Sequence, residues 1–242
     1  MSADVFGPPS SEPVPAHPAP LPPATRPVQG LATALTVLFY VVVAAQVASV
    51  AAGVRVHLAA HRVITEGPGA GRELDSADRM LIVVGGAQGV PILATGVVFL
   101  IWFYRVRVNG GMFRPDGFFR RTSGWAVAAW FLPFANLVMP YGIAKDTWHA
   151  STQYGPGGEY REVATAPVTA WWTAWAVGSV FDYIADEVYG VAESAEQVRS
   201  AALFGAVGDL LILAAALLAI RFVQRLTAMQ QVMSAEGPRA AA

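Results

Sequence analysis

Three aspartates lie in or beside apolar segments, where an ionisable side chain is costly and therefore usually paired or functional. Asp209 lies inside the apolar run 201–222, about 12 Å along a helix from its first residue. Asp182 and Asp186 stand four residues apart, and so on one helix face, at the end of the preceding apolar run. If these two helices pack antiparallel, the three carboxylates face one another and form a proton or cation site. The alternative places Asp209 near the lipid headgroups or bonded to a neighbouring helix.

Two histidines, His57 and His61, share one helix face in "VHLAAH" and could together chelate a metal. A zinc-protease helix needs the pattern HExxH, whereas Leu, Ala and Ala separate these two rings. No third ligand stands nearby, and the chain contains no cysteine. We therefore expect no metal site, and we interpret the pair as histidines at the outer end of a membrane helix.

Catalytic and nucleotide-binding motifs are absent from the sequence. No nucleophile–base pair can be nominated, and "GGAQG" at 85–89 lies in an apolar helix, where it does not form a phosphate loop. A net charge of -1 and the lack of any nucleic-acid motif argue against a nucleic-acid partner. We expect a protein that is not an enzyme and that binds no cofactor.

The apolar residues come in blocks, and the chain is 55% hydrophobic and 14% charged. Soluble domains are about 25% charged. Blocks of about twenty residues match the thickness of a bilayer's hydrocarbon core. The pattern predicts an all-α, multi-pass helix bundle in the cell membrane, with the lipid bilayer as its first partner. Its five hydrophobic segments are 31–52, 80–104, 124–144, 168–180 and 201–222.

The ends of the chain differ from this membrane-embedded region, 30–231. Residues 1–29 are rich in Pro, Ala and Ser, a composition that cannot bury a core, and we expect a disordered tail. Residues 232–242 are expected to form a second disordered tail.

The third hydrophobic segment, "FLPFANLVMPYG" at its centre, contains residues that a spanning helix disfavours. Pro133 interrupts the helix near half the bilayer depth. The Asn136 side chain could bond the backbone groups that a turn exposes there, and Pro140 suits the first turn of a returning helix. We expect this segment to re-enter, which leaves four crossings. The alternative is five crossings with a proline kink.

Positive charge supports re-entry, because basic residues accumulate on the cytoplasmic side of membrane proteins. Five arginines lie between residues 105 and 121, which marks this connector as cytoplasmic. With a re-entrant third segment, eleven of the 16 basic residues fall inside. With five crossings, nine fall outside. We therefore predict that both termini are cytoplasmic.

Four stretches carry a family resemblance: "FLIWFYRVRVN", "GWAVAAWFLPFANLVMPYGIAKDTWHAS", "VTAWWTAW" and "RLTAMQ". In this order they resemble a family of bacterial, typically actinobacterial, multi-pass membrane proteins, the domain of unknown function 4328. The resemblance covers roughly residues 30–231. Its most specific part is the set Trp130, Pro133, Asn136 and Pro140. It implies a membrane location and no particular activity.

Three functions are compatible with these patterns. The first is a non-enzymatic scaffold or regulator that binds a protein partner through the Pro-rich tail or the basic connector 105–121. The second is a small transporter or channel in which Asp209 binds the ion, with Asp182 and Asp186 beside it. The third, an intramembrane enzyme, has no candidate nucleophile. The sequence alone favours them in this order.

Overall fold

The computed structural model describes residues 25–159 and 161–239, and this part of the chain is helical. It confirms the all-α class: no strand is formed among these residues, and Tyr154 and Arg239 make only an isolated bridge. The α-helices are α1 (Gln29–Glu66), α2 (Gly71–Phe113), α3 (Trp125–Ala128), α4 (Met139–Ala150), α5 (Ala166–Gly190) and α6 (Ala195–Glu236). Two 3-10 helices complete the set, η1 (Pro68–Ala70) and η2 (Ala135–Leu137).

Three helical segments of the described chain are long and apolar enough to cross a membrane: α1, η1 with α2, and α6. These helices extend well beyond the apolar runs. The turn between α1 and α2 begins at Gly67, whose φ of 87° favours glycine. Beside it, Arg62 and Glu73 form an ion pair with a nitrogen–oxygen distance of 2.8 Å.

Helix α5 extends the predicted fourth segment by ten residues, as far as Gly190. It is not among the three segments above, and its last third carries Asp182, Asp186 and Glu187. A short link then leads to α6, which begins with a capping box: Ser194 accepts from the Gln197 amide, and the Gln197 side chain accepts from the Ser194 amide.

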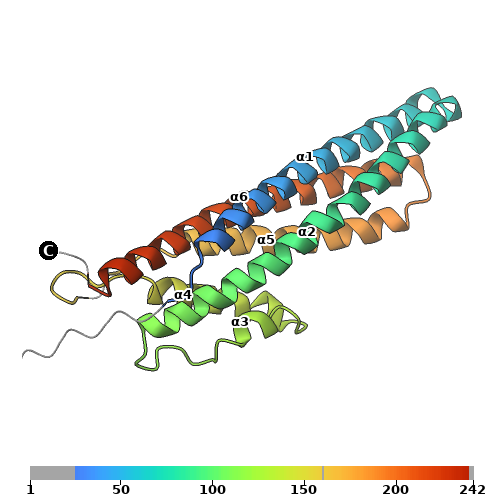
Figure 1. The fold of residues 1–242 in the computed structure, drawn as a ribbon. Helices are drawn as coiled ribbons and strands as arrows, with labels where there is room; N and C mark the ends of the chain where they lie inside the picture. Colours follow the sequence, from blue (N-terminus) through green and yellow to red (C-terminus); the bar gives the residue numbers. More distant parts are fainter. Residues whose placement is uncertain (1–24, 160, 240–242) are drawn as a thin grey trace, which may run out of the picture.

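The four long helices form an antiparallel bundle (Figure 1). Helix α1 packs along both α2 and α6, and α5 packs along α6. Helices α2 and α5 flank this central pair and do not pack along each other. Helix α5 approaches α6 closely at Gly178, where a Cβ would lie 3.2 Å from the backbone nitrogen of Ile212. Below, the "arginine end" is the end where α2 and α6 finish, and the "hairpin end" is the end that contains Gly67.

The third hydrophobic segment turns back on itself. Three residues before it, the carbonyl of Arg121 accepts a 2.6 Å hydrogen bond from Arg107 of α2. Six residues after it, at the end of α4, Ala150 lies against Gly110, one turn further along α2. Between these points Trp130 packs on Phe99, eight residues and about 12 Å from Arg107 along the helix. The residues that flank the segment on its two sides therefore both lie beside the arginine end of α2.

The proline residues of this segment lie where a turn needs them, but the expected role of Asn136 is wrong. Pro140 occupies the first turn of α4, as predicted. The turn before it is closed by backbone hydrogen bonds, including Asn136 N to Leu132 O at 3.0 Å. The Asn136 side chain makes no hydrogen bond to any described residue. Phe134, with φ of 60°, supplies the bend.

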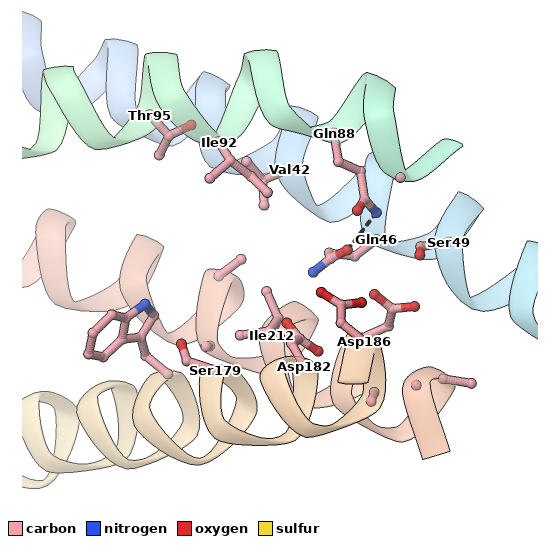
Figure 2. Close-up of a pocket in the computed structure, with 18 of the residues that line it drawn as sticks. Val42, Gln46, Ser49, Gln88, Ile92, Thr95, Ser179, Asp182, Asp186 and Ile212 are labelled. Atoms are coloured by element: carbon pink, nitrogen blue, oxygen red, sulfur yellow. Dashed lines mark hydrogen bonds between the residues drawn. The ribbon is translucent and has the colours of Figure 1, made fainter. Parts of the chain in front are cut away.

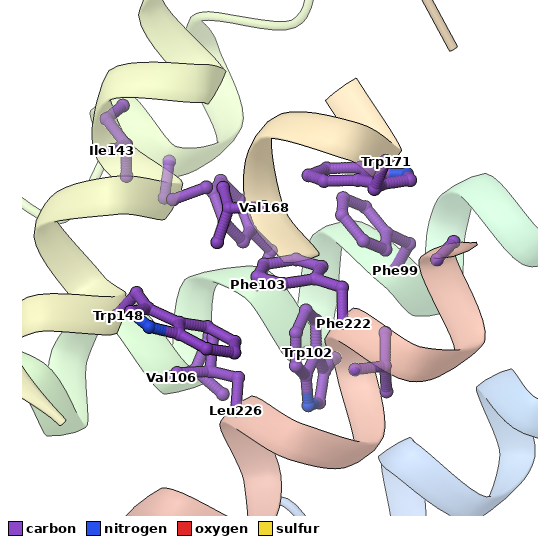
Figure 3. Close-up of a cluster of buried hydrophobic side chains, with 14 of the residues drawn as sticks. Phe99, Trp102, Phe103, Val106, Ile143, Trp148, Val168, Trp171, Phe222 and Leu226 are labelled. Atoms are coloured by element: carbon purple, nitrogen blue, oxygen red, sulfur yellow. The ribbon is translucent and has the colours of Figure 1, made fainter. Parts of the chain in front are cut away.

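At the arginine end, aromatic side chains from four helices form the main core (Figure 3). Trp171 of α5 stacks on Phe222 of α6 with ring centroids 4.6 Å apart. Trp148 of α4 stacks on the same Phe222, at 6.2 Å. Trp102 of α2 meets it edge-on and donates to Thr227 at 3.1 Å. This cluster fixes α4 and the third segment against the bundle.

A buried polar network lies beyond this core. The Gln230 amide nitrogen donates to the Val106 carbonyl at 2.8 Å and to the Ser151 hydroxyl at 3.0 Å. Its oxygen accepts from Asn109 at 3.1 Å, and Asn109 also bonds both backbone groups of Arg26. Each family-like stretch "RVRVN", "DTWHAS" and "RLTAMQ" supplies a member. The network ties the start of α1 to the ends of α2, α4 and α6.

The predicted tails are only partly described. Residues 1–24 lie outside the described part of the chain, and Arg26 is already bound to Asn109. The second predicted tail, 232–242, is wrong in its first five residues, because α6 continues to Glu236. Beyond the helix, the Pro238 carbonyl accepts from Tyr154 at 2.8 Å.

Candidate functional site

A cavity of about 850 Å³ lies between α2 and α5, with α1 and α6 as its floor. We call it the acidic chamber. Its volume falls in the range of about 300–1,000 Å³ that is usual for small-molecule sites. Its polar lining residues are Gln46, Ser49, Gln88, Thr95, Ser179, Asp182, Asp186, Tyr189 and Asp209.

The structure brings the three predicted carboxylates together in this chamber. Asp182 and Asp186 come from α5 and Asp209 from α6, and all three line the same cavity. Gly208 makes the approach possible, because a Cβ there would collide with Oδ1 of Asp182. No described residue that lines the chamber is basic. The carboxylates therefore share the site without a positive partner.

Two amides and a hydroxyl face the carboxylates from the α1–α2 side (Figure 2). The Gln88 amide nitrogen donates to the Gln46 oxygen at 2.7 Å and to the Ala45 carbonyl at 3.1 Å. Ser49 lies beside Asp209. Gln46 is 3% exposed as a residue, and its amide nitrogen, which bonds no described residue, is not itself among the fully buried atoms without a partner. Figure 2 shows this nitrogen pointing into the chamber, toward α5.

The chamber is bounded at both ends by contacts that join α2 to α5. At the hairpin end, the Tyr189 hydroxyl of α5 donates to Asp78 of α2 at 2.6 Å. Toward the arginine end, Trp130 of the third segment lies between the two helices. Its ring centroid is 5.6 Å from that of Phe99 on α2 and 5.4 Å from that of Trp175 on α5. The turned-back segment therefore closes the space that α2 and α5 leave open.

The other sequence candidates lie elsewhere. The His57 ring is bonded to the Arg199 carbonyl at 2.9 Å, and His61 lies 3.5 Å from the Arg199 guanidinium. Both line a second, shallower hollow outside the chamber. Of the motif residues, only Trp130 lines the chamber, while Pro133, Asn136 and Pro140 shape the turn behind it. Within the described residues, no group of three or more His, Asp or Glu is arranged to hold a metal ion.

Several residues that line the chamber were not predicted from the sequence. Gln46 and Gln88 interrupt the apolar runs "VVVAAQVASV" and "GGAQGVPI", and that interruption was an available signal. A polar side chain inside a membrane helix commonly bonds another helix, as these two do. The Tyr189–Asp78 contact joins residues 111 positions apart, and no local pattern indicates it.

The basic connector is largely used inside the fold. Arg107 and Arg114 are only 6% and 7% exposed. Arg107 lies over the Phe119 ring at 3.4 Å, and Arg114 over the Tyr154 ring at 3.9 Å. Arg105 donates to the Pro27 carbonyl at 3.1 Å. These arginines hold the connector to the bundle.

Comparison with protein families gives one match. The family described as a domain of unknown function, DUF4328, matches residues 68–228. Since this range is more than half of the chain, the chain belongs to that family. It runs from η1 into α6 and so includes the third segment and all three chamber aspartates, and it ends just before Gln230. No curated protein and no solved structure matches the chain.

Proposed function

We propose that this member of the DUF4328 family is a small membrane transporter that binds a proton or a cation in the chamber lined by Asp182, Asp186 and Asp209. One observation carries the proposal: three carboxylates and no basic residue line a cavity that α5 forms with α1, α2 and α6, the three helices that are long and apolar enough to cross a membrane. This was the second of the three functions compatible with the sequence. The geometry of the chamber supports it over the scaffold and the enzyme.

The electrostatics of such a chamber favour positive charge. An ionised carboxylate in apolar surroundings loses much of its hydration energy, and two more carboxylates nearby add repulsion. The cluster lowers its free energy by taking up protons or by attracting a cation. A site that binds either protons or a cation suits a transporter, because the carboxylates can exchange a proton for another cation.

We further propose that the membrane topology has four crossings. Helices α1, α2, α5 and α6 cross, and the third segment enters from the cytoplasmic side and returns to it. The proposal is supported by the placement of Arg121 and Ala150 beside one region of α2, and by the basic residues that this topology leaves inside. Both termini are then cytoplasmic.

Cysteines test this topology, since the natural chain has none. Arg120→Cys and Glu159→Cys, in the two connectors around the third segment, should react with a membrane-impermeant maleimide from the same side. Asp75→Cys, at the start of α2, should react from the opposite side. Reaction of the first two from opposite sides would mean that the third segment crosses.

A scaffold role has less support. The basic connector, one of its two proposed docking sites, directs Arg105, Arg107 and Arg114 into contacts within the chain. The other proposed docking site, the Pro-rich tail, lies mostly outside the described residues. A purely structural role would also leave the unpaired acids of the chamber without a purpose. We propose no enzymatic activity, because the Ser49 hydroxyl beside Asp209 has no histidine or lysine next to it among the described residues that line the chamber.

Reaction with dicyclohexylcarbodiimide tests the proposal. This apolar reagent modifies protonated carboxyl groups in apolar surroundings, and mass spectrometry locates the adduct. We expect labelling of Asp182 or Asp209 in membranes, and slower labelling when sodium or a higher pH displaces the proton. Asp116, exposed in the connector, is the matched control and should stay unlabelled. Absence of labelling at all three chamber aspartates at every pH would overturn the proposal.

A further inference from the structure

We propose that the acidic chamber takes an amphipathic organic cation, with an aromatic or aliphatic body at the arginine end and a positive charge at the carboxylates. This inference rests on the proposed function, because it places the ligand at the same three aspartates. It adds the chemical class of the substrate.

The first support is a gradient of polarity along one face of α5. Trp171, Trp175 and Ser179 line the chamber in that order, followed by Asp182 and Asp186. Their spacing of three or four residues keeps them on one side of the helix. Seven residues separate Trp175 from Asp182, about 10 Å of helix. A ligand lying along this face therefore passes from aromatic rings to carboxylates over the length of a small amphipathic molecule.

The second support is the aromatic end itself. Trp130, Trp175 and Phe99 line it from three different segments. The centroid of the Trp130 ring lies 5.7 Å from that of Trp172, and that of Trp175 lies 4.8 Å from that of Trp172, so the indoles form one continuous group. Aromatic faces bind apolar rings and also attract cations. A bare inorganic ion would leave this half of the chamber unused.

The third support is the amide of Gln46. This side chain is 3% exposed, and its oxygen is occupied by Gln88. The amide nitrogen has no partner among the described residues and points into the chamber (Figure 2). This nitrogen is accessible from the chamber, so a ligand that supplies an acceptor there adds a hydrogen bond. The geometry therefore points to an oxygen close to the ligand's positive charge.

The size of the chamber agrees with an organic ligand. Its volume of about 850 Å³ is far larger than a dehydrated metal ion needs. Pockets of this size bury most of a drug-sized molecule. Charge selects the class: with three acids and no basic lining residue, a cation is favoured over an anion of the same size.

A pair of ions with the same shape and opposite charge tests the proposal on the unmodified protein. Tetraphenylphosphonium and tetraphenylborate are dialysed against the purified protein in detergent. We expect tetraphenylphosphonium to bind at least about tenfold more tightly, a difference of ~1.4 kcal/mol. Equal binding of the two ions would mean an apolar groove that takes any lipid-like molecule, and would overturn the inference.

Isosteric variants locate the bound cation. Asp182→Asn should weaken tetraphenylphosphonium binding about tenfold. Asp116→Asn, in the connector, should leave it unchanged. Equal affinity in wild type and Asp182→Asn would overturn the placement of the charge. If Asp182→Asn fails to fold, the comparison of the two ions still decides.

Gln46 has its own test. Procaine, an aromatic amine with an ester oxygen, should bind less tightly to Gln46→Leu than to wild type. Tetraphenylphosphonium, which has no acceptor, should bind both equally. Weakening of neither ligand, or of both to the same extent, would overturn the role given to Gln46.

The two proposals fail in different ways. Carbodiimide labelling of Asp209 without tetraphenylphosphonium binding would leave a proton or inorganic cation site and overturn only the organic ligand. Absence of labelling would overturn the proposed function and this inference together.

Discussion

Asp182 of α5 lies against Gly208 of α6, and its carboxylate fills the space that a side chain at Gly208 would occupy. The residue next to Gly208 in the chain is Asp209, so one glycine sets how closely the two acids approach. At Gly205, three residues earlier, a Cβ would meet only the methyl group of Ala185 at 3.7 Å, an ordinary contact.

This difference predicts opposite outcomes for two similar variants. Gly208→Ala should displace the Asp182 carboxylate and slow its carbodiimide labelling. Gly205→Ala should leave labelling unchanged, and it should stabilise the protein by up to about 1 kcal/mol through helix propensity. Labelling by mass spectrometry and thermal unfolding in detergent measure the two effects. If Gly208→Ala labels at the wild-type rate, the carboxylate does not depend on this contact.

The Tyr189–Asp78 hydrogen bond closes the hairpin end of the chamber and predicts a gate. A bond to a charged group is worth about 1.5–3 kcal/mol, so its loss should favour opening by roughly 10- to 100-fold. In a Ser179→Cys background, Tyr189→Phe should therefore speed labelling by a cationic thiosulfonate reagent added outside. Tyr183→Phe, at a residue of the same helix that is 68% exposed, is the control. Equal rates in the two variants would contradict the gate.

The polar network around Gln230 predicts a stability effect far from the chamber. Gln230→Leu leaves Asn109, Ser151 and the Val106 carbonyl each short of a partner. We expect a loss of about 1–3 kcal/mol in the free energy of unfolding. Gln224→Leu, on an exposed face of the same helix, should cost little. Thermal unfolding in detergent compares them, and equal stability would show that the network contributes nothing measurable.

Asn136 provides a prediction that the structure reverses. Its position between two prolines suggests a buried side chain that bonds the turn, and hence a costly Asn136→Leu change. In the fold, the backbone makes those bonds and the side chain makes none among the described residues. Asn136→Leu should therefore change stability by no more than about 0.5 kcal/mol. A loss comparable to that of Gln230→Leu would restore the structural role of Asn136.

Sequence patterns predicted the parts of this fold that depend on local chemistry. Apolar runs located the long helices, and Pro140 located the start of α4, because both act within one or two turns. The same patterns misplaced helix ends: α6 continues to Glu236, since Gln230 and Met233 are held by tertiary packing. Propensity alone does not contain that contribution.

The chamber was predictable only in part. The sequence predicted that Asp182, Asp186 and Asp209 face one another, because the helices of the fourth and fifth hydrophobic segments were expected to pack antiparallel. Gln46 and Tyr189 face them through contacts between α1, α2 and α5, and those contacts depend on how α2 crosses the bundle. Such crossings follow from side-chain packing over the whole interface, which spacing along the chain does not reveal.

Proton movement through the reconstituted protein tests the central claim most directly. Proteoliposomes that contain a pH-sensitive dye are placed under an imposed membrane potential. The lumen of liposomes that contain the wild-type protein should acidify faster than that of empty liposomes. The measurement is made under two conditions, without and with tetraphenylphosphonium as exchange substrate. Asp209→Asn should reduce the rate at least about tenfold, equivalent to 1.4 kcal/mol, while Asp116→Asn should keep it. Wild-type rates equal to those of empty liposomes under both conditions, or an Asp209→Asn rate equal to wild type, would contradict the account.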